Sequence, residues 1–165
     1  MYKVGVIVIS DRAARGERRD ACLPAFQEAL SGSEFEIVDN TIVDDNPENV
    51  RLALTQFINT GLQLVFTSGG TGFAPRDNTP EVTREIIEKP APGIDEAIRT
   101  FSRSKSPYAI YSRGVSGIAG QTLIINLPGS PRAVKEIVTF LLPTLHHPLK
   151  LIAGRLADCR EDIER

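Results

Sequence analysis

Residues 62–81 read LQLVFTSGGTGFAPRDNTPE, and the fold prediction rests on this stretch. The apolar run from Leu62 to Phe66 predicts a buried strand. Thr79-Pro80-Glu81 predicts a helix beginning at about residue 80, because threonine caps helices, proline suits the first helical turn and an acid complements the positive helix end. A strand joined to a helix by a loop is the repeating unit of α/β proteins.

The same alternation extends outward in both directions. Asn46-Pro47-Glu48 and Ser130-Pro131 repeat the capping pattern at two more helix starts. A tight turn at Gly120-Gln121 predicts one antiparallel strand in an otherwise parallel sheet, and Pro143 predicts a kink in the last helix. Strands are expected at residues 4–9, 35–43, 62–66, 116–120 and 122–127; helices are expected at about 22–30, 47–60, 80–89 and 94–104, and from 131 onward.

Composition indicates an ordinary globular chain. Of 165 residues, 41% are hydrophobic and 24% are charged, and the net charge is −2. This leaves no overall positive field to attract nucleic acid or an anionic membrane. We predict a single-domain three-layer α/β sandwich over residues 1–154, with helices on both faces of a mostly parallel sheet and a charged tail over residues 155–165.

The opening segment and the cysteines point to an intracellular setting. MYKVGVIVIS is too short to cross a membrane and lacks the features of a signal peptide, so we expect a cytoplasmic protein. Cys22 and Cys159 are too few for a disulfide framework, and we expect both as thiols. His146 and His147 are adjacent and would point in different directions on a helix, which argues against a zinc site.

Four polar clusters follow predicted strands, and they predict the position of a ligand site. Ligands of open α/β sheets bind outside the carboxyl ends of the strands. Each cluster alone has a simpler explanation, such as a solvated acid or a helix cap, but their concentration at one sheet edge does not. The clusters are Ser10-Asp11-Arg12, Asp44-Asp45, Thr67 to Asp77, and Gly129-Ser130-Pro131.

The loop from Thr67 to Gly72 is the strongest signal. Three glycines in four positions let an anion approach backbone N–H groups closely, although a tight turn without a ligand is the simpler alternative. The spacing matches neither a Walker loop nor the dinucleotide pattern G-x-G-x-x-G. Asp77 forms a turn or, with Asp45, holds Mg²⁺ beside phosphates. Arg12, Arg76 and Arg113 are candidate phosphate contacts.

Five segments together resemble the MogA/MoaB family of molybdenum-cofactor biosynthesis, and the resemblance runs from about residue 3 to 154. The order of GGTG, RD-x-TP and LPGSP is specific to that family. Asn78 departs from the pattern, because the family more often has an apolar residue there. The segments are VIVISDR (6–12), TIVDDNPENV (41–50), TSGGTGFAPRDNTPEVT (67–83), APGIDEAIR (91–99) and SRGVSGIAGQTLIINLPGSP (112–131).

The resemblance implies a compact α/β domain assembled as a trimer or a dimer of trimers, with a molybdenum insertase as a further partner. It implies Mg²⁺-dependent transfer of AMP from ATP to the terminal phosphate of molybdopterin, with release of pyrophosphate. Asp45 and Asp77 match the two essential acids, which are the metal ligands. The implied binding residues are Ser10, Asp11, Ser68, Gly69, Gly70, Thr71, Gly72, Arg76, Ser112, Gly129 and Ser130.

Three other functions stay open from the sequence. The chain resembles the compact MoaB-like branch, whose members are not all active, so one alternative binds molybdopterin without turnover. A second is a phosphatase or nucleotidyl hydrolase that uses the same two acids. A third is a structural oligomer in which the glycine loop makes subunit contacts, with Leu149, Leu151 and Ile152 available for an interface.

Overall fold

The computed structural model describes residues 1–154, so the predicted tail and Cys159 lie outside the described residues. Its centre is one six-stranded sheet in the order β2-β1-β3-β6-β5-β4. The strands are β1 (Tyr2–Ile9), β2 (Phe35–Val43), β3 (Leu64–Ser68), β4 (Lys89–Pro90), β5 (Ser116–Ala119) and β6 (Thr122–Leu127). Strands β2, β1, β3 and β6 pair in parallel.

Strand β5 runs opposite to both of its neighbours. The turn that reverses the chain is at Gly120, whose φ of 58° lies in the left-handed region that favours glycine. The predicted single antiparallel strand is therefore confirmed. The two-residue strand β4, which the sequence pattern did not predict, closes this edge of the sheet.

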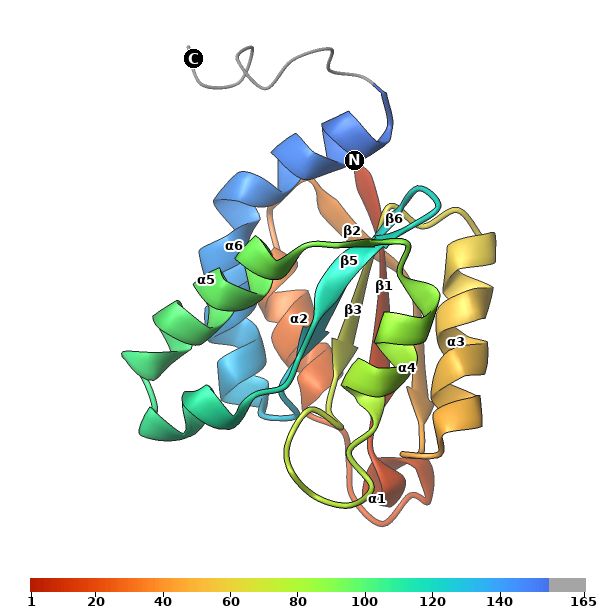
Figure 1. Cartoon of the computed structure of the whole chain (residues 1–165), viewed down its shortest axis with the longest axis vertical. Coiled ribbons are helices and arrows are strands. Elements are labelled where there is room, and N and C mark those ends of the chain that lie inside the picture. Colours follow the sequence, from red (N-terminus) through yellow and green to blue (C-terminus); the bar gives the residue numbers. More distant parts are fainter. Residues whose placement is uncertain (155–165) are drawn as a thin grey trace.

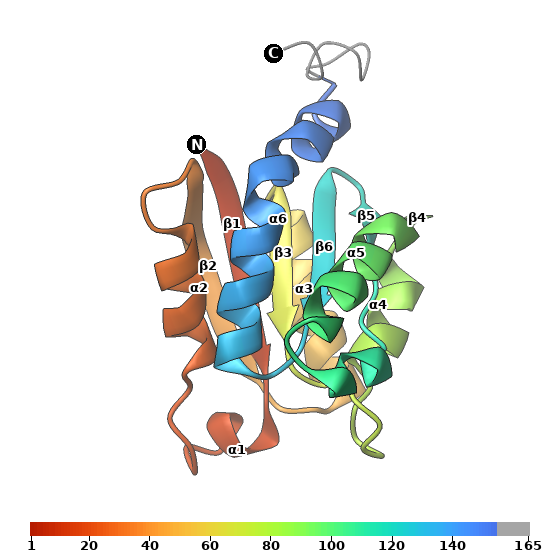
Figure 2. The same ribbon diagram turned by 90° about the vertical axis from the view of Figure 1, so that its left-hand side faces the viewer.

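Helices cover both faces of the sheet (Figures 1 and 2). Apolar side chains of α2, α5 and α6 pack in one buried cluster with one face, and those of α3 and α4 pack with the other. The three-layer sandwich is as predicted. The helices are α1 (Asp11–Ala14), α2 (Cys22–Leu30), α3 (Pro47–Asn59), α4 (Thr79–Ile86), α5 (Pro92–Arg103), the 3₁₀ helix η1 (Pro107–Tyr111) and α6 (Pro131–Ile152).

The central strands are buried on both sides, as expected for a parallel sheet. Every residue of β3 and β6 is buried, whereas β2 alternates because it is an edge strand. Phe66 packs against Phe26 at a ring distance of 5.4 Å on the α2 side. On the other side, a Cβ on Gly5 would lie 2.5 Å from the Phe57 ring, so the absence of a side chain lets α3 pack closely on β1.

Three details differ from the sequence-based prediction. Strand β3 ends at Ser68 rather than Phe66, because Thr67 and Ser68 are fully buried and pair with β1 and β6 despite being polar. Helix α4 is preceded by Asn78 as its cap residue, so Thr79 lies inside the helix and does not cap it. Helix α6 continues through Pro143 and also Pro148, and Figures 1 and 2 show it bending in this second half.

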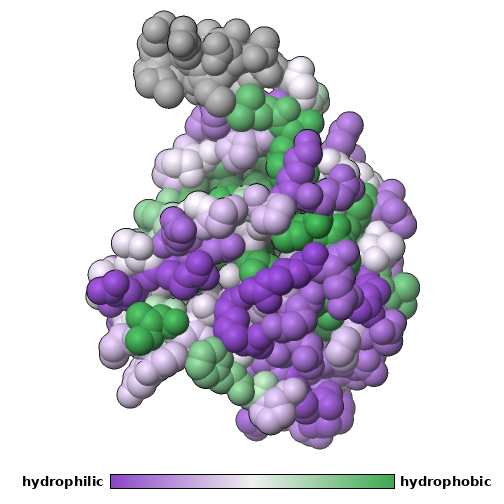
Figure 3. Space-filling view, in the orientation of Figure 1, coloured by the Kyte–Doolittle hydropathy of each residue, from purple (hydrophilic) through white to green (hydrophobic). Residues whose placement is uncertain are grey.

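Strand direction places the loops after β1, β3 and β6 at one end of the sheet, the lower end in Figure 1. The chain leaves β1 toward β2 on one side and returns to β3 on the other, which makes the β1–β3 boundary the point where ligands bind in such sheets. The face drawn in Figure 3 is mainly hydrophilic, with separate hydrophobic patches. Within residues 1–154, no helix combines the length and the apolar composition that a bilayer span requires.

Candidate functional site

A cavity of about 690 Å³ opens at the carboxyl ends of the central strands. The loops after β1, β3 and β6 form one side of it, and α5 and η1 form the other. Most of the residues singled out from the sequence meet here, but Asp11 and the three arginines Arg12, Arg76 and Arg113 are not part of the lining. Those that line it are Ser10, Asp45, Ser68, Gly69, Gly70, Thr71, Gly72, Asp77, Ser112, Gly129 and Ser130.

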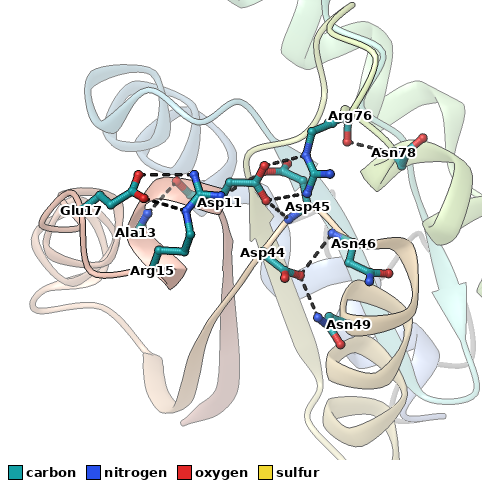
Figure 4. A network of polar contacts seen from close by, with 11 residues as sticks. Asp11, Ala13, Arg15, Glu17, Asp44, Asp45, Asn46, Asn49, Arg76 and Asn78 are labelled. Carbon is teal, nitrogen blue, oxygen red and sulfur yellow. Dashed lines mark hydrogen bonds and ion pairs between the residues drawn. The ribbon is translucent and has the colours of Figure 1, made fainter.

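Asp11 and Asp45 lock the ends of β1 and β2 together (Figure 4). The backbone N–H of Asp11 donates to Oδ2 of Asp45, and the N–H of Asp45 donates to Oδ1 of Asp11, each at 3.0 Å. Asp44 points away toward Asn46 and Asn49, to which it is hydrogen-bonded at 3.2 and 2.8 Å. Adjacent acids therefore have different roles, since only Asp45 faces the cavity.

The two locked acids ionise differently. Hydrogen bonds from Arg76 and from the Asp45 backbone lower the pKa of Asp11 to about 2. The pKa of Asp45 is raised, mainly by desolvation on burial and further by the nearby charges of Asp11 and Asp77. Asp45 and Asp77 are thus close enough to repel each other, and a cation between them would relieve that repulsion.

Both cavity acids lie against glycines of the loop. One carboxylate oxygen of each acid accepts a backbone hydrogen bond, and the other accepts none from the described residues. A Cβ on Gly70 would lie 3.3 Å from Oδ1 of Asp45, and one on Gly72 would lie 2.8 Å from Oδ2 of Asp77. Oδ2 of Asp77 accepts from the Ala74 N–H at 2.9 Å. Within residues 1–154, Oδ1 of Asp45 and Oδ1 of Asp77 accept no protein hydrogen bond.

In the glycine loop, the carbonyl groups are hydrogen-bonded and the N–H groups are not. The carbonyls of Gly70, Thr71 and Gly72 accept from Thr79 N, Arg113 N and Arg113 Nε at 3.1, 3.0 and 2.7 Å. No group in the described part of the chain accepts from the N–H groups of these three loop residues. Gly70, Thr71 and Gly72 line the cavity, and consecutive free N–H donors of this kind are suited to binding an anion.

The N-terminus of α6 adds further donors to the same wall. Ser130 caps this 22-residue helix by accepting from Ala133 N at 3.4 Å, and the positive helix end lines the cavity. Ser68 donates to the carbonyl of Pro128 at 3.1 Å, which ties the loop after β3 to the loop after β6. The Cys22 thiol donates to the Gly129 carbonyl at 3.6 Å, and burial raises the pKa of that thiol.

The three arginines proposed as phosphate contacts lie elsewhere or are already engaged. Arg76 forms a bidentate ion pair with Asp11 at 2.6 and 2.8 Å (Figure 4). Arg113 holds the loop, donating to the Gly72 and Asp77 carbonyls and pairing with Glu81. Arg12 is exposed and is not part of the cavity lining. Arg76 and Arg113 therefore shape the loop in this structure.

Sequence reasoning missed the second wall of the cavity. Arg99, Ser102 and Lys105 project from α5 and the residues just after it at spacings of three, a helical signal that could have marked one polar face. Arg18 and Arg19, from the segment before α2, line the same space. Arg18, Arg19 and Lys105 form no ion pair with any residue from 1 to 154, so their charges are available to an anion.

The donor set fits a hard divalent cation bound together with phosphates. Two carboxylates, each with one uncommitted oxygen, are what Mg²⁺ uses when substrate phosphates and waters complete its shell. Within residues 1–154 there is no cluster of three or more His, Cys, Asp or Glu side chains that could hold a metal. The residues that could hold it are Asp45 and Asp77.

Comparison with known proteins gives one consistent result. The family described as "Probable molybdopterin binding domain" matches residues 5–147. The molybdopterin adenylyltransferase of Helicobacter pylori J99 is 36% identical over 96% of this chain and 92% of its own length. Drosophila melanogaster molybdenum cofactor synthesis protein cinnamon is 41% identical over 95% of this chain, which spans only 26% of that longer protein.

A solved structure gives the same picture. The crystal structure of the molybdopterin biosynthesis enzyme MoaB from Thermus thermophilus superposes with a TM-score of 0.88. It is 44% identical and covers 93% of this chain and 98% of its own. The resemblance noted from the five sequence segments is therefore confirmed.

Proposed function

This chain belongs to the family of probable molybdopterin binding domains, and we propose that it is a nucleotidyltransferase of molybdenum-cofactor biosynthesis, a molybdopterin adenylyltransferase. In the proposed reaction, AMP passes from ATP to the terminal phosphate of molybdopterin and pyrophosphate leaves. The support from the comparisons is a relative of matching length with that activity in its name.

The single observation that carries the proposal lies in the glycine loop. The backbone N–H groups of Gly70, Thr71 and Gly72 have no acceptor in the described residues, and they lie in the same cavity as the Asp45 and Asp77 carboxylates. Phosphates need donors and a cation needs acids, and one cavity offers both. Its volume of about 690 Å³ lies within the range of ligand sites. The positive side chains of the α5 wall favour a second anionic substrate facing the first.

The proposed reaction needs little acid–base chemistry. A terminal phosphate monoester is largely dianionic at neutral pH, because its second pKa is about 6. One of its oxygens attacks the α-phosphorus of ATP, and the bond from that phosphorus to the bridging oxygen breaks, so pyrophosphate leaves with the electron pair. The loop N–H groups and the α6 N-terminus bind and orient phosphate oxygens, which reduces repulsion between the two anions.

Mg²⁺ would neutralise charge on the ATP phosphates when bound, and Asp45 and Asp77 would hold it. Asp11 fixes Asp45 by donating its backbone N–H to Oδ2. The turn from Ala74 to Asp77 fixes the second acid in the same way. Each carboxylate thus keeps its other oxygen directed to a ligand without losing its orientation.

The test mixes the purified chain with ATP, Mg²⁺ and molybdopterin, and follows adenylylated pterin and pyrophosphate together. We expect Asp45→Asn and Asp77→Asn to lower the rate by about 10²–10³-fold, as for the loss of an electrostatic group at a transition state. Asp44→Asn is the matched control, because Asp44 is the adjacent acid and points away from the cavity. It should keep near-normal activity.

The alternatives give different outcomes in the same assay. Pterin binding that survives both substitutions, with no product from the unmodified chain, would identify a binding member without turnover. Inorganic phosphate released without molybdopterin would identify a hydrolase. Equal loss of activity in the Asp44→Asn control would mean that the two cavity acids have no special role.

We also propose assembly as a trimer or a dimer of trimers, a cytoplasmic location and a molybdenum insertase as downstream partner. The support is family membership. Light scattering checks the first, since a trimer has three times the chain mass of 18.0 kDa. A monomeric mass at micromolar concentration would contradict it.

A further inference from the structure

Thr79, at the start of α4, carries a hydroxyl group that the fold does not use. The residue is 1% exposed, and its Oγ1 has no hydrogen-bond partner anywhere in residues 1–154. Buried hydroxyls are normally paired, so an unpaired one beside Gly70 of the loop calls for an explanation. Helix capping does not provide one, because Asn78 is the cap residue and α4 has no side-chain cap.

The hydroxyl lies beside the carboxylate of Asp45. A Cβ placed on Gly70 would lie 2.3 Å from Thr79 Oγ1 and 3.3 Å from Asp45 Oδ1. Both oxygens therefore lie next to the Gly70 Cα, in space that a side chain on residue 70 would fill. Oδ1 is also the Asp45 oxygen to which no described protein group donates.

The backbone around Thr79 is fixed from two directions. Its N–H donates to the Gly70 carbonyl at 3.1 Å, which anchors the loop to α4. Its carbonyl accepts from the Thr83 hydroxyl at 2.8 Å, and Asn126 Nδ2 donates to Thr83 Oγ1 at 3.0 Å. Because Asn126 also donates to Thr67 on β3 at 3.0 Å, this buried chain of hydrogen bonds sets where the Thr79 side chain can lie.

We propose that Thr79 is a positioning residue: when the cation of the nucleotide phosphates binds, the Thr79 hydroxyl donates to Oδ1 of Asp45 and holds that carboxylate in the orientation that binds the cation. The inference rests on the proposed function, because it assigns the cation to Asp45 and Asp77. It gives the hydroxyl a partner in the cation-bound state and explains why residue 70 has no side chain where the Thr79 hydroxyl lies. Residues that orient a metal ligand without touching the metal change affinity by about 10–100-fold when removed.

The experiment measures Mn²⁺ binding by electron paramagnetic resonance, with a non-hydrolysable ATP analogue and without molybdopterin. Thr79→Val keeps the side-chain shape and removes the hydroxyl, and we expect Mn²⁺ affinity to fall about 10–100-fold. Thr79→Ser keeps a hydroxyl and should bind within about threefold of the unmodified chain. Thr79→Ala is the second hydroxyl-free variant and should match Thr79→Val.

Thermal unfolding without cation or nucleotide separates positioning from a structural role. Since the hydroxyl has no partner in the folded chain, Thr79→Val should unfold at the same temperature as the unmodified protein or higher. Thr83→Val is the matched control from the next turn of α4, where the hydroxyl is hydrogen-bonded, and it should unfold at a lower temperature.

Each outcome decides between the two proposals. Unchanged Mn²⁺ affinity in Thr79→Val, with binding lost in Asp45→Asn, overturns this inference and leaves the cation site standing. A lower unfolding temperature for Thr79→Val, or an equal loss of affinity in Thr79→Ser, also overturns it. Mn²⁺ binding that is absent from the unmodified chain, or unaffected by Asp45→Asn, overturns the cation site and this inference with it.

Discussion

At Gly70 two separate requirements exclude a side chain. Its φ is +64°, a region that L-residues rarely adopt, and a Cβ there would lie 2.3 Å from Thr79 Oγ1, which is too close. Gly61, after α3, has a similar φ of +72° but nothing within 4 Å of an added Cβ. The pair of glycines therefore distinguishes backbone strain from steric exclusion.

Replacement by alanine should show that difference. Gly61→Ala carries only the left-handed backbone cost, about 1–2 kcal/mol of unfolding free energy. Gly70→Ala carries the same cost and must also displace Thr79, so we expect it to lose about 1–3 kcal/mol more. Urea denaturation measures both, and equal losses would show that the contact at Gly70 is relieved without cost.

The ion pair of Asp11 with Arg76 predicts an acid-sensitive contribution to stability. The pKa of Asp11 is about 2 in the folded chain against a usual 3.8, so the ionised form is favoured by folding. That contribution is complete above about pH 4 and disappears as the pH falls toward 2. We expect the difference in unfolding free energy between the unmodified chain and Asp11→Asn to be constant from pH 5 to 7 and to shrink below pH 4.

Salt provides the control for this prediction. The Arg76 side chain is 62% exposed, so its attraction to Asp11 is screened by solvent and further reduced by added salt. Half-molar sodium chloride should reduce the same difference at pH 7. A difference that is independent of both pH and salt would mean that Asp11 acts through its backbone contact with Asp45 alone.

At the scale of elements, the position of α4 depends on a short buried network rather than on apolar packing alone. Asn126 on β6 donates to Thr67 on β3 and to Thr83 on α4, and it accepts from the Val115 N–H at 3.2 Å. One side chain thus joins two strands to a helix. The helix in turn holds the glycine loop, because the Thr79 N–H donates to the Gly70 carbonyl.

Asn126→Ala should be costly, because it leaves buried groups without partners. We expect a loss of about 2–4 kcal/mol of unfolding free energy, from the unpaired Val115 N–H, the loss of the bonds that Asn126 donates to the Thr67 and Thr83 hydroxyls, and the space left by the side chain. Asn49→Ala is the matched control on the exposed face of α3 and should change stability by about 0.5 kcal/mol or less. Similar losses in the two variants, measured by chemical denaturation, would contradict the anchoring role of Asn126.

Element types were predictable where capping residues and apolar periodicity agreed. The start of α3 after Asn46 and that of α6 after Ser130 are confirmed, with both side chains accepting helix N–H bonds. The end of β3 was not predictable, because polar Thr67 and Ser68 are buried through pairing that only the whole sheet provides. Thr79 carries the same capping pattern, yet Asn78 takes the cap position.

At the scale of the whole molecule, the strand order decides which loops meet. The sequence predicted that polar strand ends gather at one edge, and the structure places Asp45, Asp77 and the glycine loop in one cavity; their catalytic roles remain predictions. The wall from α5 and η1 was not predicted. Its position depends on strand β5 turning back beside β6, a long-range arrangement that local patterns do not encode.

The two sides of the cavity differ in what mutation can change. On one side, a Cβ on Gly69 would lie 2.1 Å from the Ile9 carbonyl oxygen, and one on Gly129 would lie 3.3 Å from the Gly69 Cα, so main chain meets main chain. A substitution at Gly69 or Gly129 would disrupt this backbone contact and could not change its chemical character gradually. The opposite side, from α5 and η1, offers side chains instead, so exchange of residues 99–111 is the change expected to alter ligand selectivity without disturbing this backbone contact.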